Sequence, residues 1–93
     1  MAKSIIQKEK RCFIHNCGAT NIEDHHIFFG PLRKISEKHG FKVWLCAEHH
    51  RGQIGPHHNT DANLVLKRIC QATFEINHSR EEFMKIIGRN YLD

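Results

Sequence analysis

Histidine is the residue type whose number and grouping stand out in this chain. The 93 residues include nine histidines, and six of these occur as adjacent pairs. The pairs are His25 with His26, His49 with His50, and His57 with His58. Imidazole is a common ligand for zinc and for the neighbouring transition metals. Because the pairs are internal and lie among apolar residues, they indicate metal chemistry more than a solvated surface.

Four residues have the spacing of a structural zinc site. They form two short pairs far apart in the chain, Cys12 with Cys17 and Cys46 with His49. Structural zinc sites use Cys and His ligands in such pairs, with few residues inside each pair. His15 lies inside the first pair and is an alternative ligand to Cys17, and ordinary buried thiols are the alternative to zinc. The sequence therefore predicts a structural Zn²⁺ ion on Cys12, Cys17, Cys46 and His49.

Composition is that of a small globular domain. The formal net charge is +4, the hydrophobic fraction is 40% and the charged fraction is 26%, which weakly favours a polyanionic partner. No apolar run approaches the roughly 18 residues of a membrane span, and the N-terminus lacks the apolar region of a secretory signal. We therefore expect a cytoplasmic protein with reduced thiols and no membrane partner. A bound metal would stabilise so short a chain, whose core is small.

The apolar pattern of the first two thirds predicts two short strands. Residues 22–29 form the first candidate strand, which a Gly-Pro pair would end. Residues 41–45 form the second, and a short helix that carries the second histidine pair is expected to begin near Ala47. The basic residues 32–40 between the strands are expected to be irregular or partly helical. Residues 1–10 are expected to form a loosely held arm or a short helix.

The C-terminal third has helical periodicity. From Asp61 onward, apolar residues recur at steps of three and four positions, and Asp61 is the expected N-cap. A capping box that begins at Ser79 predicts another helix, and Gly88 is its expected end. Cys70 lies on the apolar stripe of the first of these helices, so we expect it in the core.

Two segments resemble the motifs of the HNH (ββα-metal) endonuclease family. Residues 24–28 (Asp-His-His-Ile-Phe) resemble its first motif, and residues 43–50 (Val-Trp-Leu-Cys-Ala-Glu-His-His) resemble its last. The chain resembles small HNH proteins of phages and prophages of Gram-positive bacteria, over nearly its whole length from Cys12. The resemblance implies one α+β domain over residues 1–93. Its parts would be a small zinc-stapled ββα-metal (His-Me finger) core with both zinc knuckles at 11–60, and C-terminal helices at 61–93.

The resemblance implies hydrolysis of DNA phosphodiester bonds with one divalent metal ion, Mg²⁺, Mn²⁺, Ni²⁺ or Zn²⁺. His26 would be the general base. His25 and His50 would be the main ligands of this catalytic metal, and His57 would be a third ligand or a phosphate contact. Asp24 shares a strand face with His26 by simple alternation, which makes it an alternative to His25 as ligand or an orienting residue behind the ligands.

The middle Asn of the family motif is missing from this chain, because the corresponding position falls near Phe41. That Asn usually orients the base histidine, and Asn21 or a backbone carbonyl is a candidate to replace it. The departure leaves a second interpretation open. In it, the chain is a non-catalytic DNA-binding or protein-interaction zinc module of the same fold, or a structural adaptor in a larger complex.

Several basic residues are candidates for contacts with DNA phosphates. They are Arg33, Lys34, Lys38 and Arg51. DNA is favoured over RNA through the resemblance alone. The same resemblance implies a phage- or prophage-encoded protein in the cytoplasm of a bacterial host, with phage packaging, recombination or replication proteins as candidate partners.

Overall fold

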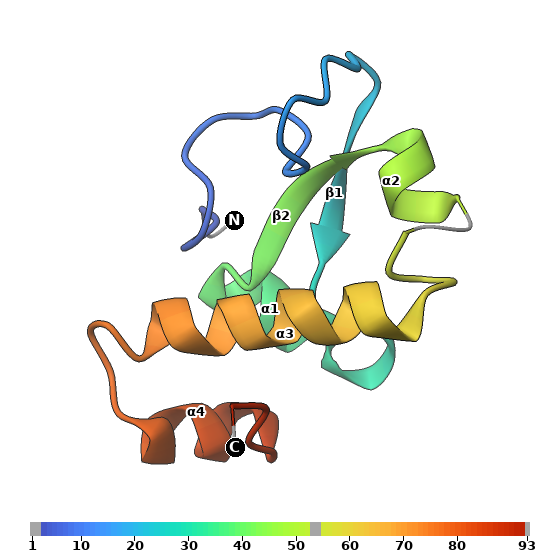
Figure 1. The fold of residues 1–93 in the computed structure, drawn as a ribbon. Coiled ribbons are helices and arrows are strands. Elements are labelled where there is room, and N and C mark those ends of the chain that lie inside the picture. Colours follow the sequence, from blue (N-terminus) through green and yellow to red (C-terminus); the bar gives the residue numbers. More distant parts are fainter. Residues whose placement is uncertain (1–2, 53–54, 93) are drawn as a thin grey trace.

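The computed structural model describes residues 3–52 and 55–92, and its two strands pair into one antiparallel sheet (Figure 1). A short helix follows the sheet directly, and two longer helices complete the chain. In order, the elements are β1 (Ile22–His26), a 3-10 turn η1 (Gly30–Leu32), α1 (Arg33–His39), β2 (Lys42–Cys46), α2 (Ala47–Arg51), α3 (Thr60–Phe74) and α4 (Arg80–Ile87). The predicted α+β class is confirmed, and so is the start of a helix at Ala47.

The register of the sheet places the two adjacent histidines of β1 on opposite faces. His25 lies opposite Val43, and His26 lies opposite Lys42. Directly opposite residues of antiparallel strands project from the same face, whereas successive residues alternate. His25 therefore projects toward the buried face with Val43, and His26 projects toward the other face with Lys42.

The first strand is shorter than predicted. It ends at His26, although the Ile27 N–H still donates to the Phe41 carbonyl at 2.9 Å, and the later residues of the predicted range 22–29 leave the sheet. The cause is a contact with α1, because Ser36 takes both backbone groups of Phe28. The Phe28 N–H donates to Ser36 Oγ at 3.0 Å, and Ser36 Oγ donates to the Phe28 carbonyl at 2.7 Å. This exchange turns the chain away from the sheet after Ile27.

Gly40 ends α1 and also supports the N-terminal segment. Gly40 has a φ of 74°, the left-handed conformation common at a helix C-terminus. A Cβ atom there would lie 2.1 Å from the Lys3 carbonyl oxygen, and the Ile5 N–H donates to the Gly40 carbonyl at 3.0 Å. Residues 3–10 form neither a helix nor a loose arm. They pack against β2, with Gln7 Oε1 accepting from the Trp44 N–H at 2.8 Å.

The predicted N-cap of α3 is wrong by two residues. Asn59 caps the helix, and its Oδ1 accepts from the Ala62 N–H at 3.1 Å. Asp61 lies inside the first turn instead, where its charge still complements the helix dipole. Both residue types are good caps, so local sequence did not separate them.

Replacing each of these residues by alanine distinguishes the two roles. Asn59→Ala is expected to cost about 1 kcal/mol, because it removes the cap of α3. Asp61→Ala is expected to cost about half as much, through the dipole alone. Urea unfolding of the two variants measures the difference, and a larger loss for Asp61→Ala would contradict the observed cap.

The capping box of α4 is confirmed. Ser79 Oγ accepts from the Glu82 N–H at 3.1 Å, and the Glu82 carboxylate accepts from the Ser79 N–H at 3.2 Å. Gly88 ends the helix with a φ of 90°, as predicted. This reciprocal arrangement satisfies backbone donors that would otherwise lack partners at the start of the helix.

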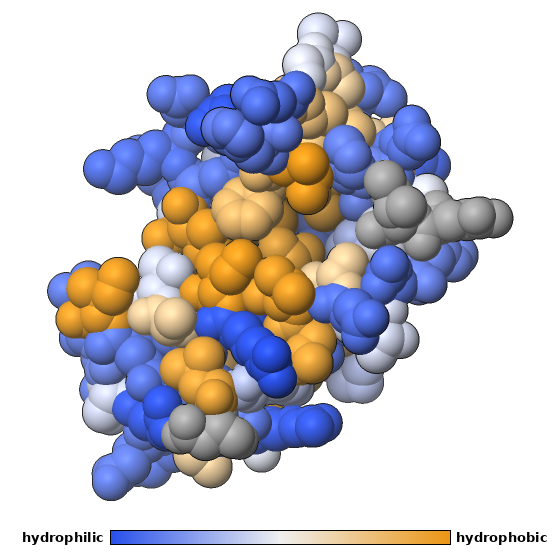
Figure 2. Space-filling view, viewed as in Figure 1, coloured by the Kyte–Doolittle hydropathy of each residue, from blue (hydrophilic) through white to orange (hydrophobic). Residues whose placement is uncertain are grey.

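The core lies where the sheet and α1 meet the C-terminal helices. Four aromatic rings form its centre, with neighbouring centroids 5.6–5.9 Å apart, from Phe28, Phe41, Phe74 and Phe83. Cys70 is fully buried beside them, as predicted. Apolar residues also gather on the surface of the face on which α3 lies (Figure 2). Within the described ranges, every helix is too short or too polar to cross a bilayer.

Candidate metal centres

The first cluster of metal ligands joins the two predicted zinc knuckles. The donor atoms of Cys12, Cys17, Cys46 and His49, here named the Cys/His cluster, all lie within 4.8 Å of one another. His49 Nδ1 is 3.2 Å from Cys46 Sγ and 3.4 Å from Cys12 Sγ. Cys17 Sγ is 3.9 Å from Cys46 Sγ. His15 is exposed and outside the cluster, so Cys17 is the fourth donor.

These distances fit a tetrahedral zinc ion. With Zn–S bonds of about 2.3 Å and Zn–N bonds of about 2.0 Å, a tetrahedron separates two sulfurs by about 3.8 Å and sulfur from nitrogen by about 3.5 Å. A backbone amide at Ala19 lowers the pKa of the Cys17 thiol and so favours the thiolate, which is the form that binds a metal. The four residues therefore lie close enough to bind a metal ion, in an arrangement compatible with structural zinc.

The second cluster consists of three imidazoles. His25, His50 and His57, here named the imidazole cluster, have donor atoms within 4.8 Å of one another. Their ring centroids form a nearly equilateral triangle with sides of 5.1, 5.1 and 4.9 Å. His50 Nε2 and His57 Nε2 are 3.2 Å apart, close to the value of about 3.3 Å expected for two imidazoles on one tetrahedral zinc. The structure thus brings together the three predicted ligands.

His25 is the most buried member of this cluster. Its side chain is 1% exposed, and neither ring nitrogen has a hydrogen-bond partner within residues 3–52 and 55–92. Burial, with smaller contributions from the neighbouring histidines, lowers the pKa of His25 to about 3. The ring is therefore neutral at pH 7, with a free lone pair. A buried polar atom without a partner is costly, and a metal ion would supply the missing partner.

Glu23 orients the second member of the cluster. Its Oε1 lies 2.8 Å from His50 Nδ1, which turns His50 Nε2 toward His57. The hydrogen bond from His50 is the main cause of a lowered pKa at Glu23. A carboxylate behind a histidine ligand is a common way to fix its tautomer and ring orientation. Arg51, a candidate DNA contact, donates to both carboxylate oxygens of Glu23, at 3.0 and 2.7 Å.

His26 is held by a carboxylate rather than by the predicted substitutes for the missing Asn. Its Nε2 lies 3.0 Å from Glu37 Oε1, while Lys42 Nζ donates to Glu37 Oε2 at 2.9 Å. The hydrogen bonds from Lys42 and then from His26 lower the pKa of Glu37 to about 2. Glu37 is therefore ionised at neutral pH and accepts the His26 N–H. Among the described residues, neither Asn21 nor a backbone carbonyl is hydrogen-bonded to this ring.

One pocket connects His26 with the imidazole cluster. It has a volume of about 240 Å³ and is lined by Asp24, His26, Phe29, Arg33, His50 and His57. His25 is not among the lining residues, and it is connected to this pocket through His50 and His57, its partners in the imidazole cluster. Asp24 lines the pocket but is not part of the imidazole cluster. Of the two alternative ligands, His25 and Asp24, the cluster contains His25. Of the basic residues on α1, Arg33 lines the pocket, whereas Lys34 and Lys38 are exposed beyond it.

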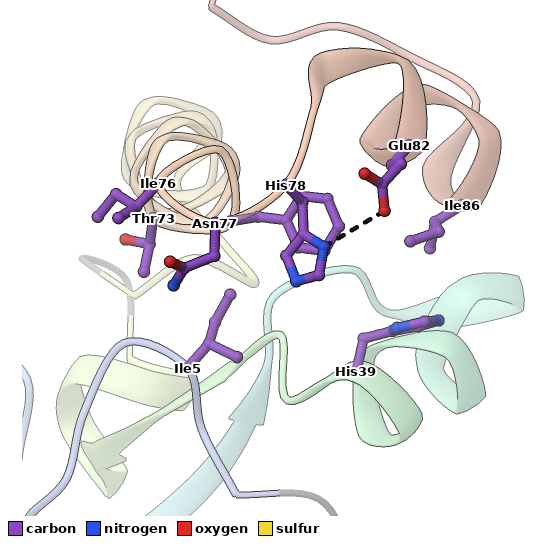
Figure 3. A pocket seen from close by; sticks show the side chains of 9 residues that line it. Ile5, His39, Thr73, Ile76, Asn77, His78, Glu82 and Ile86 are labelled. Atoms are coloured by element: carbon purple, nitrogen blue, oxygen red, sulfur yellow. Dashed lines mark hydrogen bonds and ion pairs between the residues drawn. The ribbon is translucent and has the colours of Figure 1, made fainter.

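Two further histidines stack on aromatic rings of the core. His78 stacks on Phe74 with ring centroids 4.4 Å apart, and its Nδ1 lies 3.3 Å from a Glu82 carboxylate oxygen (Figure 3). His39 stacks on Phe41 at 5.4 Å. Both rings line a cavity of about 400 Å³ between the N-terminal segment and the C-terminal helices. Neither belongs to a group of three metal donors among the described residues.

Because the ring nitrogens of His25 lack partners among the described residues, replacing His25 is expected to raise the stability of the metal-free protein and to remove metal binding at the imidazole cluster. His25→Leu, of similar volume, is expected to raise the stability of the protein without metal in the imidazole cluster by about 1–3 kcal/mol. Excess Zn²⁺ should then stabilise the wild type but not the variant. Urea unfolding with one equivalent of Zn²⁺ and with excess measures both effects. Destabilisation of His25→Leu under both conditions would show that the imidazole packs well without a metal.

The structure is a small α+β domain with two clusters of Cys and His residues that lie close enough to bind a metal, and α2 carries one histidine of each cluster. Compared with known proteins, the chain matches no family model, no curated protein and no solved structure. Function must therefore be inferred from the donor atoms, the pocket and the charges of the chain itself.

Proposed function

We propose that this protein is a metal-dependent endonuclease of the HNH (ββα-metal) type that hydrolyses DNA phosphodiester bonds. The observation that carries the proposal is the pocket shared by His26 and two members of the imidazole cluster. A base and a cation on one pocket are the two elements that hydrolysis of a phosphate ester requires. Arg33 on the same pocket adds a positive charge for a phosphate group.

The imidazole cluster would hold the catalytic cation. His25, His50 and His57 supply nitrogen donors only, and such donors suit Zn²⁺ and Ni²⁺ better than Mg²⁺ or Mn²⁺, which prefer oxygen. When bound, the ion would neutralise charge on the phosphoryl oxygens and on the leaving oxygen. Glu23 would keep His50 in the tautomer that directs Nε2 to the ion. Three protein ligands would leave a coordination position open.

His26 has the surroundings of a general base. The ionised Glu37 accepts from its Nε2–H, and in a neutral ring Nδ1 would then carry the lone pair. In the reaction, a water oxygen bonds to phosphorus, its proton passes to His26 Nδ1, and the bond from phosphorus to the leaving oxygen breaks. The Glu37 carboxylate stabilises the resulting imidazolium, as the buried Asp does in a serine protease triad.

Cleavage of a supercoiled plasmid tests the proposal. The wild type is expected to nick or linearise the plasmid when Zn²⁺, Ni²⁺, Mn²⁺ or Mg²⁺ is added, and not without added metal. His25→Leu is expected to be inactive, because it removes a buried metal ligand. His58→Leu is the matched control, since His58 is exposed and outside the cluster. No scission with any of the metals, or equal scission by His25→Leu, would sink the proposal. Retained DNA binding without scission would support the non-catalytic module.

A further inference from the structure

We propose that a second cavity, on the outer face of β2, binds an unpaired nucleotide of the substrate strand, with the base against Trp44 and phosphates near Lys3 and Lys8. The inference rests on the proposed nuclease function and narrows its substrate to nucleic acid with a single-stranded part. The cavity has a volume of about 620 Å³, within the range of pockets that take small ligands. It is named here the tryptophan cavity and is lined by Lys3, Ser4, Gln7, Lys8, Lys42 and Trp44.

Hydrogen bonds fix the walls of this cavity. Ser4 Oγ donates to the Lys42 carbonyl and accepts from the N–H groups of Ile6 and Gln7 at 3.1 and 3.0 Å. Gln7 Oε1 accepts from the Trp44 N–H at 2.8 Å. The polar side chains of the N-terminal segment are thus used to hold the segment over β2. A ligand in the cavity would meet a wall that is already in place.

The charged residues that line the tryptophan cavity are all basic. Three of its lining residues are lysines, and none is acidic. Lys42 is buried and neutralised by Glu37 at 2.9 Å. Lys3 and Lys8 are exposed, and across the described parts of the chain neither has a carboxylate within ion-pair distance. Two free ammonium groups beside one cavity favour a ligand with phosphates.

Trp44 determines which kind of phosphate ligand fits. It is the only tryptophan of the chain and is half-buried at the cavity wall. Nucleic-acid bases stack on aromatic side chains through their flat faces, with little dependence on sequence. Those faces are covered by neighbouring bases inside a duplex. A base that stacks on Trp44 must therefore belong to an unpaired nucleotide, such as one in a single strand, a flap or a frayed end.

The tryptophan cavity adjoins the pocket of the proposed nuclease site. Trp44 lies opposite Asp24 in the sheet, and Lys42 lies opposite His26, all on one face. Asp24 and His26 line that pocket, and paired strands are about 4.8 Å apart. A strand that stacks a base on Trp44 would pass directly to His26. The Asp24 carboxylate would keep phosphates away from its own side, toward Lys3 and Lys8.

Quenching of Trp44 fluorescence tests the inference without catalysis. A short single-stranded oligothymidylate, added to the full chain without divalent metal beyond its zinc, is expected to quench the emission saturably. A blunt duplex of equal length is expected to quench little. By anisotropy of a labelled oligonucleotide, Trp44→Leu is expected to weaken binding about fivefold or more, while Trp44→Phe keeps most of the affinity.

The salt dependence of binding provides a second test, because Lys3 and Lys8 are exposed and their replacement leaves the core unchanged. In the Lys3→Ala/Lys8→Ala variant, the slope of log K against log salt is expected to fall by about 1.4, since each phosphate contact on a single strand contributes about 0.7. Lys85→Ala, on α4, is the control and should leave the slope unchanged.

The outcomes separate this inference from the proposed function. An unchanged salt slope in the double lysine variant, no quenching, or preference for the duplex overturns the nucleotide site, even if the plasmid is cleaved. Oligonucleotide binding that depends on Trp44 and both lysines supports the nucleotide site. If no metal then supports scission, the nuclease proposal fails while the nucleotide site stands.

Discussion

Cys46→Ser is expected to unfold the segment before β1 and to release the metal ion of the Cys/His cluster. The segment between Cys12 and Cys17 has no helix or strand, and apart from the cluster it is tied to the sheet by few backbone hydrogen bonds, such as Phe13 N–H to the Trp44 carbonyl at 2.7 Å. Structural zinc contributes about 10–16 kcal/mol in small zinc domains, whereas whole domains are stable by only about 5–15 kcal/mol. Circular dichroism and metal analysis of the purified variant measure the loss.

Cys70→Ala is the matched control for this prediction. Cys70 is as buried as Cys46, but burial raises the pKa of its thiol and it lies outside both clusters. The control should therefore keep its zinc and lose only about 1 kcal/mol, the usual cost of a small cavity. A Cys46→Ser protein as stable as the wild type would show that the Cys/His cluster has no structural role.

Loss of the Cys/His cluster should also abolish cleavage, although none of its residues lines the pocket at His26. His49 and His50 are neighbours on α2, and each belongs to a different cluster. A zinc ion bound to His49 would therefore also fix the direction of His50. Cys46→Ser is expected to lose metal binding at the imidazole cluster together with the structure of the segment before β1.

His26→Ala is expected to reduce the rate of metal-dependent cleavage by about 10²–10⁴-fold, the usual contribution of a general base. Because His26 is not a member of the imidazole cluster, the affinity of that cluster for metal should change little. Single-turnover cleavage at saturating metal measures the rate, and equilibrium dialysis measures the affinity. The combination of a large rate loss with unchanged metal binding separates a base from a ligand.

His58→Ala is the control for His26→Ala, because it removes an exposed imidazole near the same pocket. It should cleave at the wild-type rate. If His26→Ala also cleaves at the wild-type rate, His26 is not the base. If it loses metal at the imidazole cluster, His26 is a ligand instead.

The donor residues could be predicted from the sequence because their chemistry and local spacing are visible there. Cysteine and histidine pairs at short spacing have few other uses in a small chain, which identified the Cys/His cluster, whereas the members of the imidazole cluster were expected from the family resemblance. The helix ends at Gly40 and Gly88 were predictable for a similar reason, since a left-handed residue after a helix is a local event.

The residues that orient the histidines could not be predicted. Glu23 reaches His50 across 27 positions, and Glu37 reaches His26 across 11 positions. Carboxylates are common on protein surfaces, so neither glutamate differs in sequence from a solvated one. Glu23 shares a strand face with His25 by alternation, but only the position of α2 relative to β1 brings Glu23 to His50.

The end of β1 and the start of α3 were predicted wrongly, for two different reasons. A tertiary contact ends β1, and two residues with equal capping ability lie at the start of α3. Phe28 would continue β1 by its residue type, yet the Ser36 hydroxyl takes its backbone groups. Asn59 and Asp61 are both good caps, and only the geometry of α3 selects Asn59. The choice between His25 and Asp24 was open for the same reason, because it depends on which strand face the later helices cover.

The number of metal ions bound per chain tests the central claim most directly, namely that the imidazole cluster holds a cation distinct from the zinc of the Cys/His cluster. After equilibrium dialysis against Zn²⁺, the wild type is expected to hold two ions per chain, one for each cluster. His25→Leu should hold one ion and remain folded. A wild-type protein that binds a single ion under these conditions would contradict the account.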